Sequence, residues 1–186
     1  MEAVIVSGLP AVGKTTIARI IAEKLHLRVF GGGDILKEMA DEHGVKTSGE
    51  DWWDTKEGIR FLEERKKSPK FDEDVDRRLL KKAAGGNVVI TSYPLPWLSK
   101  KGIKVWLSGS AESRAKRMAK RDKKGIEECK RVIAVRDAEN YKIYKKLYKI
   151  EFGKDLTPFD LVVGTDGMSA EEVGKEVLRY VKTRKR

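Results

Sequence analysis

The chain of 186 residues is long enough for one domain with a hydrophobic core and short for two. Hydrophobic residues make up 40% and charged residues 37%, which indicates a globular protein with a highly charged surface, and no apolar run is long enough to span a membrane. The net charge of +11 favours anionic partners such as nucleotides or RNA. A single cysteine, Cys129, excludes an internal disulfide and predicts a reducing compartment, so we expect a cytoplasmic protein.

Short apolar runs alternate with helical patterns along the chain. The apolar runs predict strands at residues 3–9, 27–30, 87–92, 103–109 and 159–163. The helical patterns predict helices at residues 13–25, 34–43, 72–84, 110–121 and 126–149, and a last helix that opens at a capping box of Ser169 and Glu172. Residues 44–70 are polar and mixed, and a helix is expected there within residues 58–67.

This alternation predicts the α/β class, with one domain over residues 1–186 and a five-stranded parallel sheet between two layers of helices. Ligands of such sheets bind beyond the carboxyl ends of the strands. We therefore expect a single crevice that is lined by residues 8–15, 31–34, 91–97 and 108–114.

The first strand is followed by a complete phosphate-binding loop of the pattern G-x-x-x-x-G-K-[ST]. Its residues are Gly8, Leu9, Pro10, Ala11, Val12, Gly13, Lys14 and Thr15. The glycines let backbone N–H groups turn inward onto phosphates, Lys14 supplies positive charge for the β- and γ-phosphates, and the Thr15 hydroxyl suits Mg²⁺. A chance match in a chain of this length is expected in about one percent of cases or fewer, so the loop predicts nucleoside triphosphate binding.

Arginines recur on two of the expected helices. One stripe, spaced three and four residues apart, consists of Arg114, Arg117 and Arg121. Such a stripe is either a solvated basic face or, beside the expected crevice, a grip for phosphate oxygens. The helix at 126–149 places Arg136 and Asp137 next to its apolar side. An interior ion pair and an arginine that lines the cleft are the two interpretations there, and we favour the cleft.

Together these residues resemble the P-loop nucleoside monophosphate kinases, and most of all the short archaeal cytidylate kinases. The likeness covers nearly the whole chain apart from about residues 44–70 and depends on the order of its motifs. The matching residues are Gly13-Lys14-Thr15-Thr16, Gly33-Asp34-Ile35, Val75-Asp76-Arg77-Arg78, the three arginines Arg114, Arg117 and Arg121, the lid arginine Arg136, and Phe159-Asp160-Leu161-Val162-Val163. The resemblance implies a three-layer P-loop NTPase fold with a helical acceptor-binding region at residues 35–84 and a lid at about 122–140.

The resemblance also implies transfer of the γ-phosphoryl group of ATP to a nucleoside monophosphate, with Mg²⁺ as the metal cofactor. It assigns ATP binding to the loop together with Thr16, Arg117 and Arg121, and metal binding to Thr15. The catalytic residues that it implies are Lys14, Asp34, Arg121 and Arg136. The acceptor-binding residues that it implies are Asp34, Lys37, Arg77, Thr91, Ser92 and Arg136.

The acceptor side departs from the family pattern at several positions. Lys37 stands where the family has an arginine, and Ile143 replaces the second lid arginine. The segment 90–94 reads ITSYP where the family places an acidic residue, a glycine and an arginine after the strand. Trp52 and Trp53 are also unusual, and they either pack within an insertion or stack on a base. The sequence therefore supports the ATP side more strongly than the acceptor side.

Three functions follow from these observations. We favour a kinase with CMP, dCMP or UMP as the acceptor. A phosphotransferase or ATPase that acts on RNA or in a ribonucleoprotein is the alternative, motivated by the net charge of +11, the basic sequence KTRKR at residues 182–186 and the altered acceptor side. An ATP-binding regulator with little turnover is the third. The sequence predicts neither the oligomeric state nor the choice between ATP and GTP.

Overall fold

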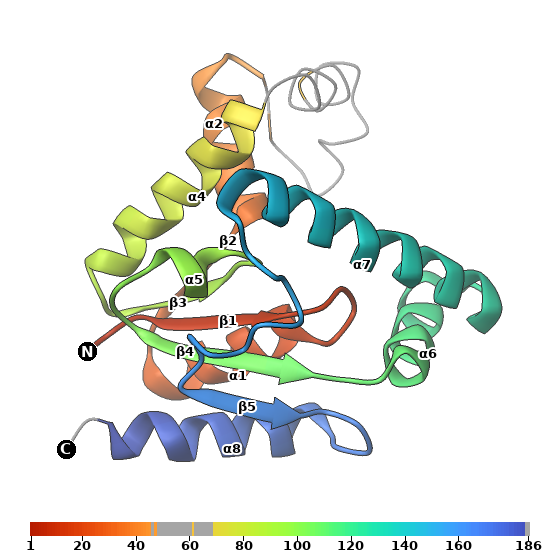
Figure 1. Cartoon of the computed structure of the whole chain (residues 1–186). Coiled ribbons are helices and arrows are strands. Elements are labelled where there is room, and N and C mark those ends of the chain that lie inside the picture. The colour runs from red at the N-terminus through yellow and green to blue at the C-terminus, as the bar shows by residue number, and fades with distance from the viewer. Residues whose placement is uncertain (46, 48–60, 62–68, 185–186) are drawn as a thin grey trace.

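A computed structural model describes residues 1–45, 47, 61 and 69–184. Trp52 and Trp53 lie outside the described residues, and the helix expected at 58–67 is described only at Phe61. Five parallel strands form one sheet in the order β2-β3-β1-β4-β5 (Figure 1). Their bounds are β1 Val4–Gly8, β2 Arg28–Gly31, β3 Val88–Thr91, β4 Ile103–Ser108 and β5 Leu161–Gly164. The predicted α/β class with a five-stranded parallel sheet is confirmed.

The central strand β1 is buried along its whole length because it pairs on both sides. Val4 stands opposite Val89 of β3 and Ile103 of β4. Its apolar run suits a strand that is covered on both faces of a parallel sheet. The last strand, β5, begins at Leu161 and not at the expected Phe159. Directly before the strand, the side-chain carboxylate of Asp160 accepts a hydrogen bond from the backbone N–H of Lys104 at 2.8 Å. Lys104 is therefore paired with the side chain of Asp160 at the point where the strand begins.

The helices follow the predicted patterns, with their ends shifted by up to three residues. Their bounds are α1 Lys14–Leu25, α2 Gly32–Glu42, α4 Pro69–Ala84, α5 Leu95–Leu98, α6 Ala111–Asp122, α7 Ile126–Tyr148 and α8 Ala170–Thr183. The short helix α5, which contains Pro96, was not predicted. The expected cap at Ser110 accepts a hydrogen bond from the Ser113 N–H at 3.1 Å, and the capping box of Ser169 and Glu172 is present.

Side chains of alternating strand residues build a core on each face of the sheet. On one face, Val4 and Val6 pack with α1 and α8. On the other face, Ile5 packs with α2 and α4. Beside that second core lies an aromatic cluster under the segment that follows α7, in which Trp97 and Trp106 meet edge to face at 6.2 Å. The two cores give the three-layer arrangement and fix the strand ends that carry the site.

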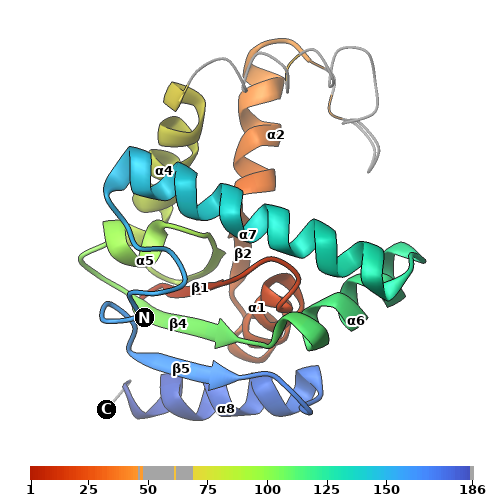
Figure 2. The same cartoon turned by 45° about the vertical axis from the view of Figure 1, so that its right-hand side comes forward.

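The strands all end on the same side of the molecule. The views in Figures 1 and 2 show α7 running from α6 past the loop between β1 and α1 toward α4. The N-terminus and the last turn of α8 lie on the opposite side, at the amino ends of the strands (Figure 1). Among the described helices, none has the length and apolarity needed to cross a membrane. The carboxyl ends of β1 and β3, the start of α2 and the length of α7 are therefore the elements available to form a site.

Candidate active site

The phosphate-binding loop is shaped by two glycines. Gly8 ends β1 with φ +151°, and a Cβ there would lie 2.5 Å from the carbonyl oxygen of Leu107. Gly13 has φ +105° and stands directly before α1. Side chains are strained at both positions, so glycine alone permits this turn. Thr15 and Thr16 are exposed in the first turn of α1, where the free N–H groups and the positive end of the helix dipole favour an anion.

Lys14 is held back against the loop. Its ammonium donates hydrogen bonds to the carbonyl oxygens of Gly8 at 2.8 Å and Leu9 at 3.0 Å, and it lies 4.4 Å from the centre of the Tyr93 ring. Burial, together with the positive charges of Arg136 and Arg114, lowers the pKa of Lys14 to about 7, whereas Asp137 opposes the shift. A polyanion in the loop would supply the counter-charge that favours the protonated form.

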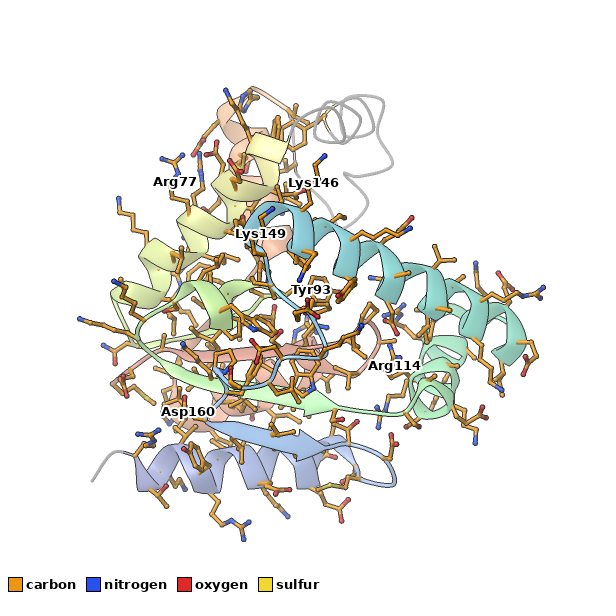
Figure 3. All side chains as sticks on the ribbon, in the orientation of Figure 1. Arg77, Tyr93, Arg114, Lys146, Lys149 and Asp160 are labelled. Atoms are coloured by element: carbon orange, nitrogen blue, oxygen red, sulfur yellow. The ribbon has the colours of Figure 1, made fainter. Side chains whose placement is uncertain are left out.

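Arg114 is a buried structural link and not part of an exposed basic stripe. Only 4% of its side chain is exposed, and it makes two hydrogen bonds to the Asp137 carboxylate, at 2.9 and 2.7 Å. It also donates to the carbonyl oxygens of Pro10 and Gly109, both at 3.2 Å. Figure 3 shows Arg114 between α6 and the loop. An interior ion pair therefore exists at Asp137, but its partner is Arg114 and not the Arg136 for which such a pair was considered. Arg114 takes neither of the two roles considered for the stripe.

Arg117, Arg121 and Arg136 line a cavity of about 630 Å³ at the phosphate-binding loop. The sequence-predicted residues that this cavity brings together are Ala11, Gly13, Lys14, Thr15, Thr16, Arg117, Arg121 and Arg136. Arg117 donates to the Thr165 hydroxyl at 2.9 Å and to the Val12 carbonyl at 3.4 Å. Arg121 pairs with its neighbour Asp122 at 2.5 and 2.8 Å and is largely exposed. Arg136, on α7, is exposed toward solvent and lines the same cavity, in line with the favoured cleft interpretation.

A second cavity of about 330 Å³ adjoins the first. It is lined by the start of α2, the inner face of α4, the segment after β3 and the second half of α7. The residues that matter below are Asp72, Asp76, Thr91, Ser92, Tyr93, Asn140, Ile143 and Tyr144. Lys14 and Tyr93 line both cavities, so the two spaces meet at these residues. Three of the four segments expected around the crevice are thereby brought together, and the fourth, 108–114, lines neither cavity.

Three of the predicted acceptor-binding residues lie outside the linings of these two cavities, as do Gly8, Leu9, Pro10 and Val12 of the loop. Asp34 accepts a hydrogen bond from the Gly31 N–H at 2.7 Å and so caps α2. Lys37 is exposed on α2. Arg77 is 75% exposed, pairs with Asp74 at 2.6 Å, and lies on the side of α4 turned away from Tyr93 (Figure 3). The structure therefore groups Thr91 and Ser92 with Lys14, but does not group Lys37 and Arg77 with them.

Sequence reasoning missed the carboxylates of the second cavity. Asp76 is 7% exposed, and its carboxylate accepts a hydrogen bond from the Tyr148 hydroxyl at 2.8 Å. Burial and this carboxylate raise the pKa of Tyr148 above its ordinary value. A signal was available, because Asp72 and Asp76 lie four residues apart on the apolar side of α4 that also carries Val75 and Leu79. Charged residues on an inward helix face indicate a polar cavity.

The residues present fit a nucleotide with a magnesium ion. The loop offers backbone N–H groups and a lysine for phosphates, and Thr15 offers a hydroxyl at the helix start. In the part of the chain that the structure describes, no three His, Cys, Asp or Glu side chains gather as metal ligands. Mg²⁺ commonly keeps several waters and binds mainly through substrate phosphates with one or two protein oxygens, so this donor set suits it.

Comparison with known proteins places the chain among kinases. Residues 3–167 match the model of the cytidylate kinase-like family. A cytidylate kinase of Pyrobaculum arsenaticum is 37% identical over 177 residues, which are 92% of this chain and 88% of that protein. A cytidylate kinase of Methanocaldococcus jannaschii is 36% identical over 173 residues, which are 90% of each chain. The fold is also similar to that of a shikimate kinase from Acinetobacter baumannii, with a TM-score of 0.60, 17% identity, and coverage of 100% of this chain and 95% of that one.

The order of motifs, the loop geometry and these full-length matches agree. The protein belongs to the cytidylate kinase-like family of P-loop kinases.

Proposed function

We propose that this protein transfers the γ-phosphoryl group of ATP to a nucleoside monophosphate, with CMP or dCMP as the acceptor. The single observation that carries the proposal is the junction of two cavities at Lys14 and Tyr93. One cavity is lined by the phosphate-binding loop and four arginines, which are Arg19, Arg117, Arg121 and Arg136, and the other is large enough for a small molecule. A donor and an acceptor seated there would meet at the lysine that neutralises phosphate charge.

The reaction moves one phosphoryl group between two nucleotides. An oxygen of the acceptor's phosphate attacks the γ-phosphorus, the bond from that phosphorus to the bridging oxygen breaks, and ADP leaves with the electron pair. The protein's task is mainly positioning and charge stabilisation. Lys14 and the loop N–H groups would hold the β- and γ-phosphates, and Arg117, Arg121 and Arg136 would face the triphosphate from the other side of the cavity. Mg²⁺ on Thr15 would neutralise charge on the phosphates.

The acceptor cavity has a polarity that suits cytosine. Its wall holds the Lys14 ammonium together with the carboxylates of Asp72 and Asp76. CMP carries an anionic phosphate on one part of the molecule and an exocyclic amino group, a hydrogen-bond donor, on the other. Ionised carboxylates accept hydrogen bonds and do not donate them, so they favour the amino group of cytosine over the carbonyl oxygen of uracil. This supports CMP or dCMP over UMP.

Several assignments stay predictions. They are a water-mediated contact of Asp34 with the metal, acceptor contacts of Lys37 and Arg77, the helical acceptor region at 35–84, the lid at about 122–140, and a cytoplasmic location. For the RNA alternative, the observation in its favour is still the net charge of +11. The oligomeric state does not enter the proposal.

A panel of acceptors tests the proposal directly. ADP formation from ATP and Mg²⁺ is measured with CMP, dCMP, UMP, AMP and RNA, each against a blank without acceptor. We expect the highest kcat/KM with CMP or dCMP. Turnover that depends on RNA and not on any monophosphate would replace this function with the RNA alternative. Nucleotide binding without turnover on any acceptor would indicate a regulator.

A further inference from the structure

Tyr93 lies in the segment Ser92-Tyr93-Pro94 that follows β3. The side chain is half-buried and lies beneath α7 near the centre of the molecule (Figure 3). It lines both cavities, a property that it shares with Lys14. A residue at this junction can contact both the ATP and the acceptor of the proposed reaction.

The ring of Tyr93 has a fixed orientation. Phe152 meets it edge to face at 5.5 Å with an angle of 88° between the ring planes, and Tyr144 lies at 6.1 Å. Its own carbonyl oxygen accepts a hydrogen bond from the Ser7 hydroxyl at 2.9 Å, which ties the backbone to β1. The face of the fixed ring lies 4.4 Å from the Lys14 ammonium. An ammonium over an aromatic face is attracted by the ring's electron density.

The hydroxyl of Tyr93 has a cation on the same cavity wall. Arg136, from α7, lines the first cavity together with Tyr93. Burial raises the pKa of Tyr93, and the positive charge of Arg136 opposes that rise. Arg136 is an exposed side chain, and a long exposed arginine has many rotamers. A hydrogen bond donated by this guanidinium to the fixed phenol hydroxyl would restrict those rotamers and keep the guanidinium at the cavity junction.

We infer that Tyr93 is a positioning residue for phosphoryl transfer, whose ring holds the Lys14 ammonium and whose hydroxyl holds the Arg136 guanidinium where donor and acceptor phosphates meet. The inference rests on the proposed function where kcat with CMP is measured. The ATP dissociation constant can be measured without an acceptor and does not depend on that function.

Two substitutions separate the two parts of the side chain. Tyr93→Phe keeps the ring and removes the hydroxyl. We expect a kcat with CMP about 10-fold lower or more, with an ATP dissociation constant close to that of the wild type, because hydrogen bonds to charged groups are among the stronger ones. Tyr93→Leu removes the ring as well, and we expect ATP to bind about 2- to 30-fold more weakly than to Tyr93→Phe.

A double-mutant cycle tests whether the hydroxyl acts through Arg136. If it does, the variant with both Tyr93→Phe and Arg136→Ala has about the same kcat as Arg136→Ala alone. Additive losses would overturn that part of the inference. Tyr180→Phe is the matched control, because the Tyr180 hydroxyl lies on α8 and accepts a hydrogen bond from Arg184 at 3.2 Å, away from both cavities. It should keep wild-type kcat and ATP affinity.

The remaining outcomes are distinguishable. Thermal unfolding of each variant shows whether it is folded, and Tyr93→Phe retains the ring packing that Tyr93→Leu loses. If the wild type has no turnover with CMP, the proposed function fails, and calorimetry with ATP still tests the ring. Equal ATP affinity of Tyr93→Phe and folded Tyr93→Leu would overturn the role of the ring. A wild-type kcat in Tyr93→Phe would overturn the role of the hydroxyl.

Discussion

The two halves of the site are built in different ways. The phosphate-binding loop of the proposed ATP side is one contiguous segment, residues 8–16, and arginines from α6 and α7 complete the cavity around it. The proposed acceptor side is assembled from four segments on α2, α4, α7 and the end of β3. A contiguous backbone site tolerates little change, whereas a cavity made of side chains can alter its chemistry one residue at a time. The complete loop motif agrees with the first description, and the cavity walled by side chains of four segments agrees with the second.

Removing the Lys14 ammonium should give the largest effect, because it is the charge shared by both cavities. We expect Lys14→Ala to lower kcat/KM about 100- to 1000-fold and leave the fold intact. ADP production with saturating CMP measures the loss, and circular dichroism measures the fold. Lys24→Ala, on the exposed side of the same helix, is the control and should behave as the wild type. Near-normal turnover in Lys14→Ala would contradict the assignment of the loop.

Changing Asp76 should affect the acceptor side alone. We expect Asp76→Asn to lower kcat/KM for CMP about 10- to 100-fold, because a hydrogen bond to a charged group is lost, and to leave ATP affinity unchanged. The relative rate with UMP should rise, since an amide can donate to a carbonyl oxygen. Asp74→Asn, at the exposed Arg77 pair on the same helix, is the control. An equal loss of kcat/KM for CMP and UMP would show that Asp76 does not distinguish cytosine from uracil.

Substitution of Arg121 should have a smaller effect on the proposed ATP side. Its guanidinium now pairs with Asp122 and is largely exposed, so it contributes little to the ground state. We expect Arg121→Ala to lower kcat about 10-fold and to change the ATP dissociation constant much less, because the residue acts mainly in the transition state. Lys120→Ala, its exposed neighbour, is the control. A change confined to KM would assign Arg121 to ground-state binding.

The pH dependence of ATP affinity should give the smallest effect. Because the pKa of Lys14 is lowered to about 7, ATP binding above that pH must take up a proton. Affinity should fall about 5-fold between pH 7 and pH 8, and calorimetry in buffers with different ionisation enthalpies should detect the proton uptake. Lys14→Arg stays charged and should bind ATP with a flat profile. The same shift means that the unfolded chain binds more protons between about pH 7 and 10.5, so this group makes folding more favourable as pH rises through that window.

Much of the fold could be predicted from the sequence because its signals are local. Apolar runs marked the strands, helical spacing marked the helices, and the loop motif marked the ATP side. The acceptor cavity could not be predicted, since its members are brought together only by long-range packing. Asp76 and Arg77 illustrate the limit, because adjacent helix residues point about 100° apart and the choice between inward and outward faces decides their roles. Arg114 was misjudged for the same reason, as its partner Asp137 lies on another helix.

The contacts of Arg114 have a mechanical consequence. One guanidinium joins the carbonyl oxygens of Pro10 and Gly109 to the carboxylate of Asp137, so the phosphate-binding loop and the middle of α7 share an anchor. The other end of α7 is joined to the second cavity, because the Tyr148 hydroxyl donates a hydrogen bond to Asp76 in its wall. One helix thus connects the phosphate-binding loop with the wall of the second cavity, so a shift of α7 would change both cavities together.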